Sequence, residues 1–148
     1  DADLSMPIEE IARFIPPHND TDIVIASREV EGAVRYDEPQ QRHITGRVFN
    51  FIIRLLALPS IHDTQCGFKG FRADVAEDLF QHQRIEGWAF DVEILYIARL
   101  RGYKIVELPI PWYYREESKI SLLQDSFRMF LDILKIRRNA RLGLYNRE

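Results

Sequence analysis

The chain has 148 residues, about the length of one domain, and its net charge of −3 gives no general argument for nucleic-acid binding. Hydrophobic residues make up 46% and charged residues 29%, which is ordinary for a globular protein with a sizeable core. Cys66 is the only cysteine, so an internal disulfide is excluded, and we expect it to be a small buried hydrophobe. No signal peptide and no apolar run of membrane-spanning length is visible.

The first half of the chain is predicted to contain two helices and one strand. Residues 7–14 form a short helix with proline at its start and acids in its first turn. Residues 22–27 are a compact β-branched run, typical of a buried strand. The polar stretch 31–41 contains glycine and proline and is predicted to be a loop. Residues 43–58 form a long helix with a wide apolar face.

The second half is predicted to continue this alternation. Residues 61–72 contain many turn-forming residues and are expected to form a loop and a short strand. Helices are predicted at 73–82 and 90–101, and a strand follows at 104–110. A last helix covers 121–138. Alternating helices and strands predict an α/β fold.

The chain begins with Asp1-Ala2-Asp3, two carboxylates separated by one residue. Such a pair can hold one Mg²⁺ or Mn²⁺ ion and leave positions open for diphosphate oxygens. The same pattern also occurs in solvated acidic loops, so its meaning depends on what stands downstream. Because the sequence starts with Asp rather than Met, we expect a piece of a longer protein.

Four downstream stretches strengthen the metal interpretation. They are ASR at 26–28, DTQCGFK at 63–69, GWAFDVE at 87–93 and WYYREESK at 112–119. Together with DADLS at 1–5, their order and spacing resemble family 2 glycosyltransferases of the polyprenyl-phosphate group. Dolichyl-phosphate glucosyltransferases and dolichol-phosphate mannose synthases belong to this group.

The resemblance implies a fold and a reaction. The fold would be a GT-A-type, Rossmann-like mixed sheet flanked by helices, and residues 1–148 would be the C-terminal portion of that single domain. The absent nucleotide-binding half would precede Asp1. The full enzyme would move a hexose from a nucleotide-diphosphate sugar to a polyprenyl phosphate with inversion, using Mg²⁺ or Mn²⁺ held by Asp1 and Asp3. Ser5 stands where mannose synthases usually carry glutamine, which favours the glucosyltransferase branch.

The resemblance also assigns phosphate-binding residues. The residues expected around the diphosphate and the acceptor phosphate are Arg28, Arg115, Ser118 and Lys119, with Arg42 or Arg47 of the long helix joining them. Guanidinium groups fork onto phosphate, and lysine acts as a point charge. The alternative is that each is an ordinary surface cation.

Further residues are expected near the sugar. The resemblance makes Asp91 a catalytic base or acceptor ligand, although aspartate is also a favoured helix N-cap. Asp63 is expected to hydrogen-bond its own turn rather than the substrate. Gly67, Phe68 and Lys69 would bring backbone close to the sugar, because glycine lacks the Cβ that would prevent this.

The two long helices, 43–58 and 121–138, have apolar faces, and the second runs into a basic tail. With the resemblance, this predicts a peripheral protein at the cytoplasmic face of a membrane, or a cytoplasmic one. Core helices with a solvated basic end are the alternative. Two rival functions stay open: a family 2 enzyme with a hydroxyl acceptor, in which Asp91 would be essential, and a non-catalytic phosphate- or membrane-binding remnant.

Overall fold

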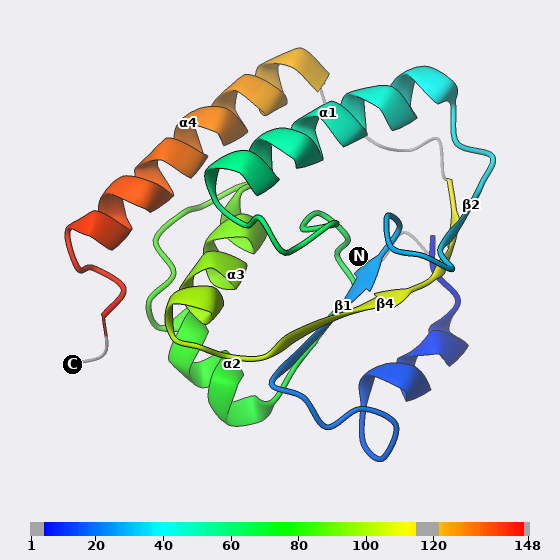
Figure 1. Cartoon of the computed structure of the whole chain (residues 1–148), viewed down its shortest axis with the longest axis horizontal. Coiled ribbons are helices and arrows are strands. Elements are labelled where there is room, and N and C mark those ends of the chain that lie inside the picture. Colours follow the sequence, from blue (N-terminus) through cyan, green and yellow to red (C-terminus); the bar gives the residue numbers. More distant parts are fainter. Residues whose placement is uncertain (1–4, 115–121, 147–148) are drawn as a thin grey trace.

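The computed structural model describes residues 5–114 and 122–146, which form a mixed α/β structure (Figure 1). The elements in chain order are the 3₁₀ helix η1 (Ile8–Phe14), β1 (Ile23–Ser27), β2 (Val34–Tyr36), α1 (Gln40–Leu56), β3 (Lys69–Phe71), α2 (Ala73–Phe80), α3 (Phe90–Leu100), β4 (Ile105–Pro109), β5 (Pro111–Tyr113) and α4 (Leu122–Arg141). The α/β class predicted from the sequence is confirmed, as a mixed sheet flanked by helices.

Strand β1 is the centre of a three-stranded sheet with the order β3-β1-β4. It runs parallel to β4 and antiparallel to β3. All five of its residues are buried: Ile23 and Ile25 belong to one hydrophobic cluster, and Val24 and Ala26 belong to another. A strand covered on both faces has no polar face, which explains its continuous apolar sequence.

The larger cluster fills the space between the sheet and the four α-helices, and the smaller one includes Phe14 of η1 (Figure 1). Helix α4 contacts both α1 and α3. Helix η1 lies apart from α1 and α4 (Figure 1). None of the helices in the described part of the chain is both long enough and apolar enough to cross a bilayer.

Most predicted elements are confirmed, with shifted ends. The helix predicted at 7–14 is a 3₁₀ helix. Helix α1 begins earlier than predicted, directly after Pro39. Proline suits the start of a helix because it lacks an N–H group, and the first N–H groups of a helix have no partner within it. Helix α4 extends to Arg141, and the left-handed Gly143 (φ 74°) follows it.

The prediction of a loop over 31–41 is partly wrong. It contains β2, which pairs in parallel with β5, and β5 was not predicted either. Both strands have only three residues, so their sequences show too little alternation to reveal them. Their pairing joins distant parts of the chain, next to the end of β4.

Candidate functional site

Charged side chains gather at one edge of the sheet. Strands β1 and β4 are parallel, so their carboxyl ends meet there, and Arg28 follows β1 directly. Antiparallel β3 begins at the same edge, where Lys69 pairs with Ile25. Ligands of open α/β sheets bind beyond the carboxyl ends of the strands, so this edge is the candidate site.

Arg28 is held by Asp63. Its Nε donates to Asp63 Oδ2 at 2.7 Å, its Nη2 donates to Oδ1 at 2.9 Å, and its main-chain N–H donates to Oδ2 at 3.0 Å. Burial acts to raise the pKa of Asp63, but the charge and hydrogen bonds of Arg28 outweigh it and hold the pKa below its ordinary value. Asp63 also accepts from Gln65 N, so the predicted turn bond exists beside the pair with Arg28.

Glu107 of β4 supports Asp63 from behind. Its Oε1 accepts from the main-chain N–H of Asp63 at 3.0 Å, and its Oε2 accepts from that of His62 at 2.9 Å. The ring nitrogen His62 Nδ1 lies 2.8 Å from the same Oε2. Glu107 therefore fixes the backbone that carries the Asp63 carboxylate.

An aromatic ring and a second arginine complete the surroundings of Arg28. The guanidinium carbon of Arg28 lies 5.3 Å from the centre of the Trp112 ring, and that of Arg35 lies 5.9 Å from it, both within cation–π range. Arg35 also donates to the Arg28 carbonyl oxygen at 3.3 Å. The two guanidinium groups are thus both placed against one indole.

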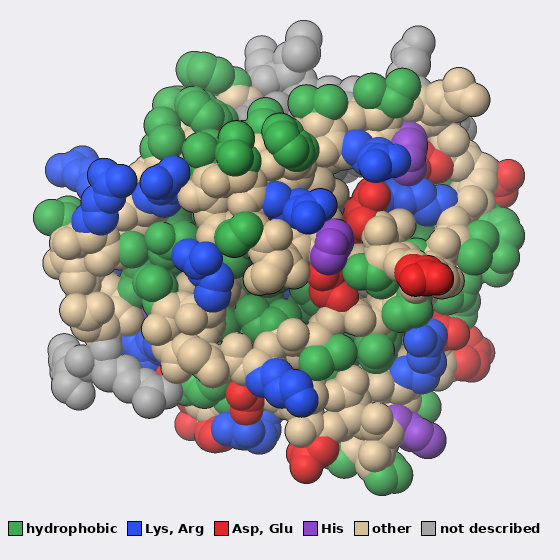
Figure 2. Space-filling view, viewed as in Figure 1, with side chains coloured by type: hydrophobic (Ala, Val, Ile, Leu, Met, Phe, Trp, Pro, Cys, Tyr) green, Lys and Arg blue, Asp and Glu red, His purple; other side chains and the backbone are tan. Residues whose placement is uncertain are grey.

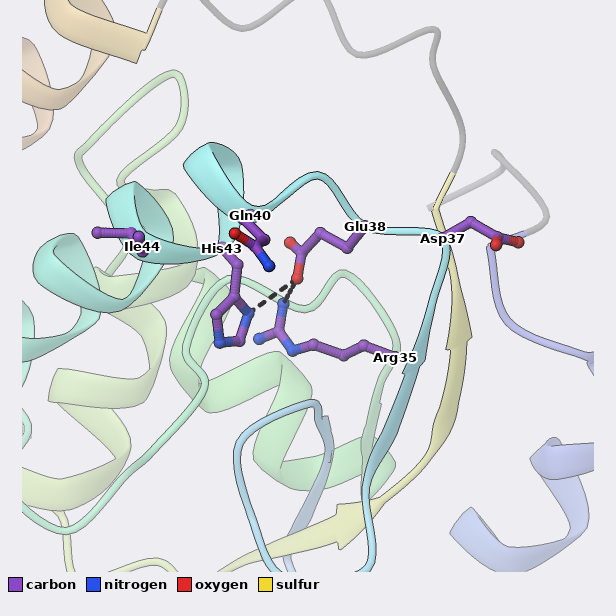
Figure 3. A pocket seen from close by; sticks show the side chains of 6 residues that line it. All are labelled: Arg35, Asp37, Glu38, Gln40, His43 and Ile44. Carbon is purple, nitrogen blue, oxygen red and sulfur yellow. Dashed lines mark hydrogen bonds and ion pairs between the residues drawn. The ribbon is translucent and has the colours of Figure 1, made fainter.

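A hollow of about 470 Å³ lies beside this pair. Its lining consists of Arg35, Asp37, Glu38, Gln40, His43 and Ile44 (Figure 3). Figure 3 shows Arg35 from β2 and His43 from α1 meeting at the Glu38 carboxylate, at 2.7 Å and 2.9 Å. The hollow therefore has a polar, charged lining on the β2 side and is bordered by α1.

A second ion pair joins β3 to α3. Lys69 Nζ lies 2.8 Å from Asp91 Oδ1 and donates to the Cys66 carbonyl oxygen at 2.5 Å. The Lys69 side chain is 5% exposed and that of Asp91 is 16% exposed. Burial raises the pKa of Asp91 above its ordinary value, while the charge of Lys69 acts in the opposite direction.

The alternative reading of Asp91 as a helix cap is wrong. Ala89 occupies the N-cap position of α3, and no side chain caps it. Neighbouring Glu93 is fully buried and accepts from the main-chain N–H groups of Arg84 and Ile85, so it is a structural residue. Of the two acids in the GWAFDVE motif, Asp91 alone lies at the charged edge.

The two ion pairs lie around Cys66, since Asp63, Arg28 and Lys69 all influence the pKa of its thiol. Burial, with the charge of Asp63, raises that pKa, and the expectation of a buried Cys66 side chain is confirmed. Phe68 is half-buried and packs edge-on against Phe14 at 4.8 Å between ring centres. Phe68 thus belongs to the core, and of the predicted sugar-proximal residues Lys69 is the one in the charged cluster.

Several predicted residues lie outside the described part of the chain: Asp1, Asp3, Arg115, Ser118 and Lys119. Arg42 lies in the first turn of α1, but its side chain is not described, and Gly67 is half-buried in the turn before Lys69. Among the described residues, no three or more acidic, histidine or cysteine side chains form a potential metal site. The metal assigned to Asp1 and Asp3 stays a prediction.

Sequence reasoning missed Arg35, Glu38, His43 and Glu107 as parts of this site. Glu107 alone had a visible signal, because it interrupts the otherwise apolar strand β4. A charged residue at such a position needs a buried partner. Arg35 lies in a strand too short to be predicted, and nothing local connects it to Arg28.

Comparisons with known proteins match this chain along most of its length. A dolichyl-phosphate beta-glucosyltransferase of Dictyostelium discoideum is 36% identical over 140 residues, which is 93% of this chain and 42% of the relative. One from Trichomonas vaginalis is 32% identical over 139 residues, 93% of this chain and 41% of the relative. The human enzyme of that name is 38% identical over 100 residues, 68% of this chain and 31% of the relative.

The chain thus spans less than half the length of these relatives. No protein-family model matches it.

Proposed function

Because this chain belongs to the dolichyl-phosphate glycosyltransferase family, we propose that the whole protein transfers glucose from a nucleotide-diphosphate sugar to dolichyl phosphate. The observation that carries the proposal is the similarity over 93% of the chain to relatives that bear this name. The charged edge supports it by position: it lies beyond the carboxyl ends of β1 and β4, where ligands of open α/β sheets bind, although its cations Arg28, Arg35 and Lys69 are each paired with a carboxylate.

We further propose that the transfer depends on a metal and inverts the anomeric centre. Asp1 and Asp3 would hold Mg²⁺ or Mn²⁺, which would neutralise charge on the diphosphate leaving group when bound. Arg115, Ser118 and Lys119 would contact phosphate, as would Arg42 or Arg47. Arg28 would offer Nη1, since its other side-chain nitrogens are bound to Asp63.

An acceptor with a polar head and an apolar chain suits the position of the hollow beside Arg35. One of its lining residues, Ile44, begins a row of exposed apolar side chains on α1 that continues with Val48, Phe51 and Leu55. The charged edge and an apolar surface therefore meet at this hollow. That combination favours an acceptor with a charged head and an apolar chain over a glycan hydroxyl.

The apolar row is part of a wider surface, which we call the apolar face. It consists of Ile44, Val48, Phe51 and Leu55 on α1 with Phe127, Leu131 and Leu134 on the adjacent α4. Figure 2 shows hydrophobic side chains gathered along the upper margin of the molecule, over these helices. Exposed cations lie on the same two helices, at Arg47, Arg128, Lys135, Arg138 and Arg141. We propose that this face binds an anionic membrane surface.

The reaction is tested with the full-length protein, a series of nucleotide sugars and dolichyl phosphate in detergent. We expect a glucosyl-lipid product that requires Mg²⁺ or Mn²⁺ and is abolished by excess chelator. Transfer that survives complete chelation would remove the metal proposal. Absence of any lipid product with every donor would contradict the proposed function.

Loss of the Asp91 carboxylate separates the acceptor classes. A lipid phosphate is already anionic near neutral pH, so Asp91→Asn should lower kcat less than Arg115→Ala or Lys119→Ala. If Asp91→Asn abolishes turnover while the other two variants stay active, a hydroxyl acceptor is indicated instead.

A further inference from the structure

The Lys69–Asp91 ion pair differs from an ordinary surface ion pair, because it joins a strand to a helix and is nearly buried. Lys69 is the first residue of β3, which is bonded to the central strand β1, and Asp91 lies in the first turn of α3. Each group therefore extends from a regular element rather than from a loop. A contact between two such elements fixes side-chain position more closely than a loop contact does.

The pair is also nearly enclosed. With 5% of its side chain exposed, Lys69 depends on the Asp91 carboxylate and the Cys66 carbonyl for the hydrogen bonds that water would otherwise supply. The closest approach of the pair is between Lys69 Nζ and Asp91 Oδ1, at 2.8 Å. The Asp91 carboxylate is not completely enclosed, since 16% of its side chain faces solvent.

We infer that Lys69 is the positioning residue of Asp91, holding its carboxylate so that the solvent-facing part of the carboxylate accepts a hydrogen bond from a hydroxyl of the substrate. The inference rests on the proposed function, which gives Asp91 its contact with substrate. Lys69 itself acts through Asp91 and the Cys66 turn. The charge of Asp63 also acts to raise the pKa of Asp91, and the charge of Lys69 opposes it.

A double-mutant cycle in the full-length protein tests this. Glucosyl transfer to dolichyl phosphate is measured for the wild type, Lys69→Met, Asp91→Asn and the double variant, with kcat and the donor KM determined separately. We expect Lys69→Met to lower kcat about tenfold with KM changed less than about threefold, and the double variant to match Asp91→Asn within about twofold. Lys69→Arg should recover part of the lost kcat.

A matched control distinguishes positioning from loss of a buried cation. Arg101 is 4% exposed and paired with Asp78, away from Asp91. Arg101→Met should lower the melting temperature as Lys69→Met does, while leaving kcat nearly unchanged in both the wild-type and Asp91→Asn backgrounds. If Lys69→Met does not fold, the same cycle is run with Lys69→Gln, which also removes the charge.

The outcomes separate the two claims. An active wild type in which the Lys69 and Asp91 effects multiply, or in which either substitution leaves kcat within about twofold, overturns the positioning role alone. A wild type that transfers no sugar removes the proposed function, and this inference with it.

Discussion

Arg28 has three of its N–H donors committed within the protein. Asp63 accepts from its Nε, its Nη2 and its main-chain N–H, and the guanidinium lies against Trp112. An arginine that has used one edge of its fork approaches a phosphate through Nη1 rather than bidentately through Nε and Nη2. Its first role in this structure is to neutralise a fully buried carboxylate.

At the residue scale the predicted positions of Arg28 and Asp63 are confirmed, while the phosphate-binding role of Arg28 stays a prediction. Arg28 was predicted because it follows a buried strand, and the Asp63 turn bond follows from aspartate's short side chain. The partner of Arg28 was not predictable, because Asp63 is 35 residues away and the contact exists only in the folded chain. Arg35 and Glu107 were missed for the same reason.

Asp63→Asn should destabilise the protein by about 3 kcal/mol at pH 7, because it leaves the Arg28 guanidinium without its anionic partner. The pKa of Asp63 is lowered in the folded state, so its stabilising contribution is complete above the unfolded pKa of about 3.9. That contribution is lost as the pH falls through the folded-state pKa. Urea unfolding of both proteins should therefore show a difference that is constant near neutral pH and shrinks in acid.

Asp74→Asn is the control, because Asp74 also accepts from an arginine, Arg72, but on the exposed surface. Its effect on the free energy of unfolding should be much smaller than that of Asp63→Asn, because water and salt screen an exposed ion pair. Equal effects of the two substitutions at pH 7 would contradict the assigned role of Asp63.

At the level of elements, periodicity identified the helices and the longer strands. The central strand, the helices at 73–82 and 90–101 and the strand at 104–110 all contain enough residues to show a pattern. Strands β2 and β5 do not, and they were missed although they carry Arg35 and Trp112 into the site. The least predictable elements therefore contribute directly to the site.

The C-terminal end of the chain is fixed to α3 by buried polar contacts. Tyr145 donates to the Glu93 Oε1 atom, and Asn139 of α4 donates to the Tyr145 hydroxyl at 3.2 Å. Glu93 also bonds the main chain just before α3. These contacts hold the segment that leads to Asp91 against α4.

Tyr145→Phe should lower the free energy of unfolding by about 1–3 kcal/mol, since it leaves a buried carboxylate oxygen with one donor fewer. Thermal or urea unfolding measures this. Tyr36→Phe is the matched control, because Tyr36 is exposed. Loss of its hydroxyl should change the free energy of unfolding only slightly. A Tyr145→Phe variant as stable as Tyr36→Phe would show that the contact adds nothing to the packing of the ring.

For the whole molecule, the charged edge and the apolar face adjoin at the start of α1. Ile44 belongs to both the hollow beside Arg35 and the apolar row. If the apolar face rests on a bilayer, as proposed above, the hollow lies beside that surface. The sequence predicted the apolar faces of the helices. It did not predict the junction between the hollow and the apolar face, because that junction depends on how α1 packs beside β2.

The last prediction concerns binding of the apolar face to anionic vesicles. Phe51 and Leu55 are 63% and 72% exposed on α1, and Ile8 is 66% exposed on η1, apart from α1 and α4 (Figure 1). Replacing Phe51 and Leu55 together by glutamate should reduce sedimentation of the full-length protein with anionic phospholipid vesicles at least about tenfold, by removing apolar insertion and adding repulsion. Ile8→Glu changes a similarly exposed side chain and should bind vesicles like the wild type. If all three proteins sediment equally, or if neutral vesicles bind the wild type as well as anionic ones, the membrane surface lies elsewhere. If binding is lost only in the α1 variant, the bilayer contact and the charged hollow share one side of the molecule, where a lipid phosphate could reach both.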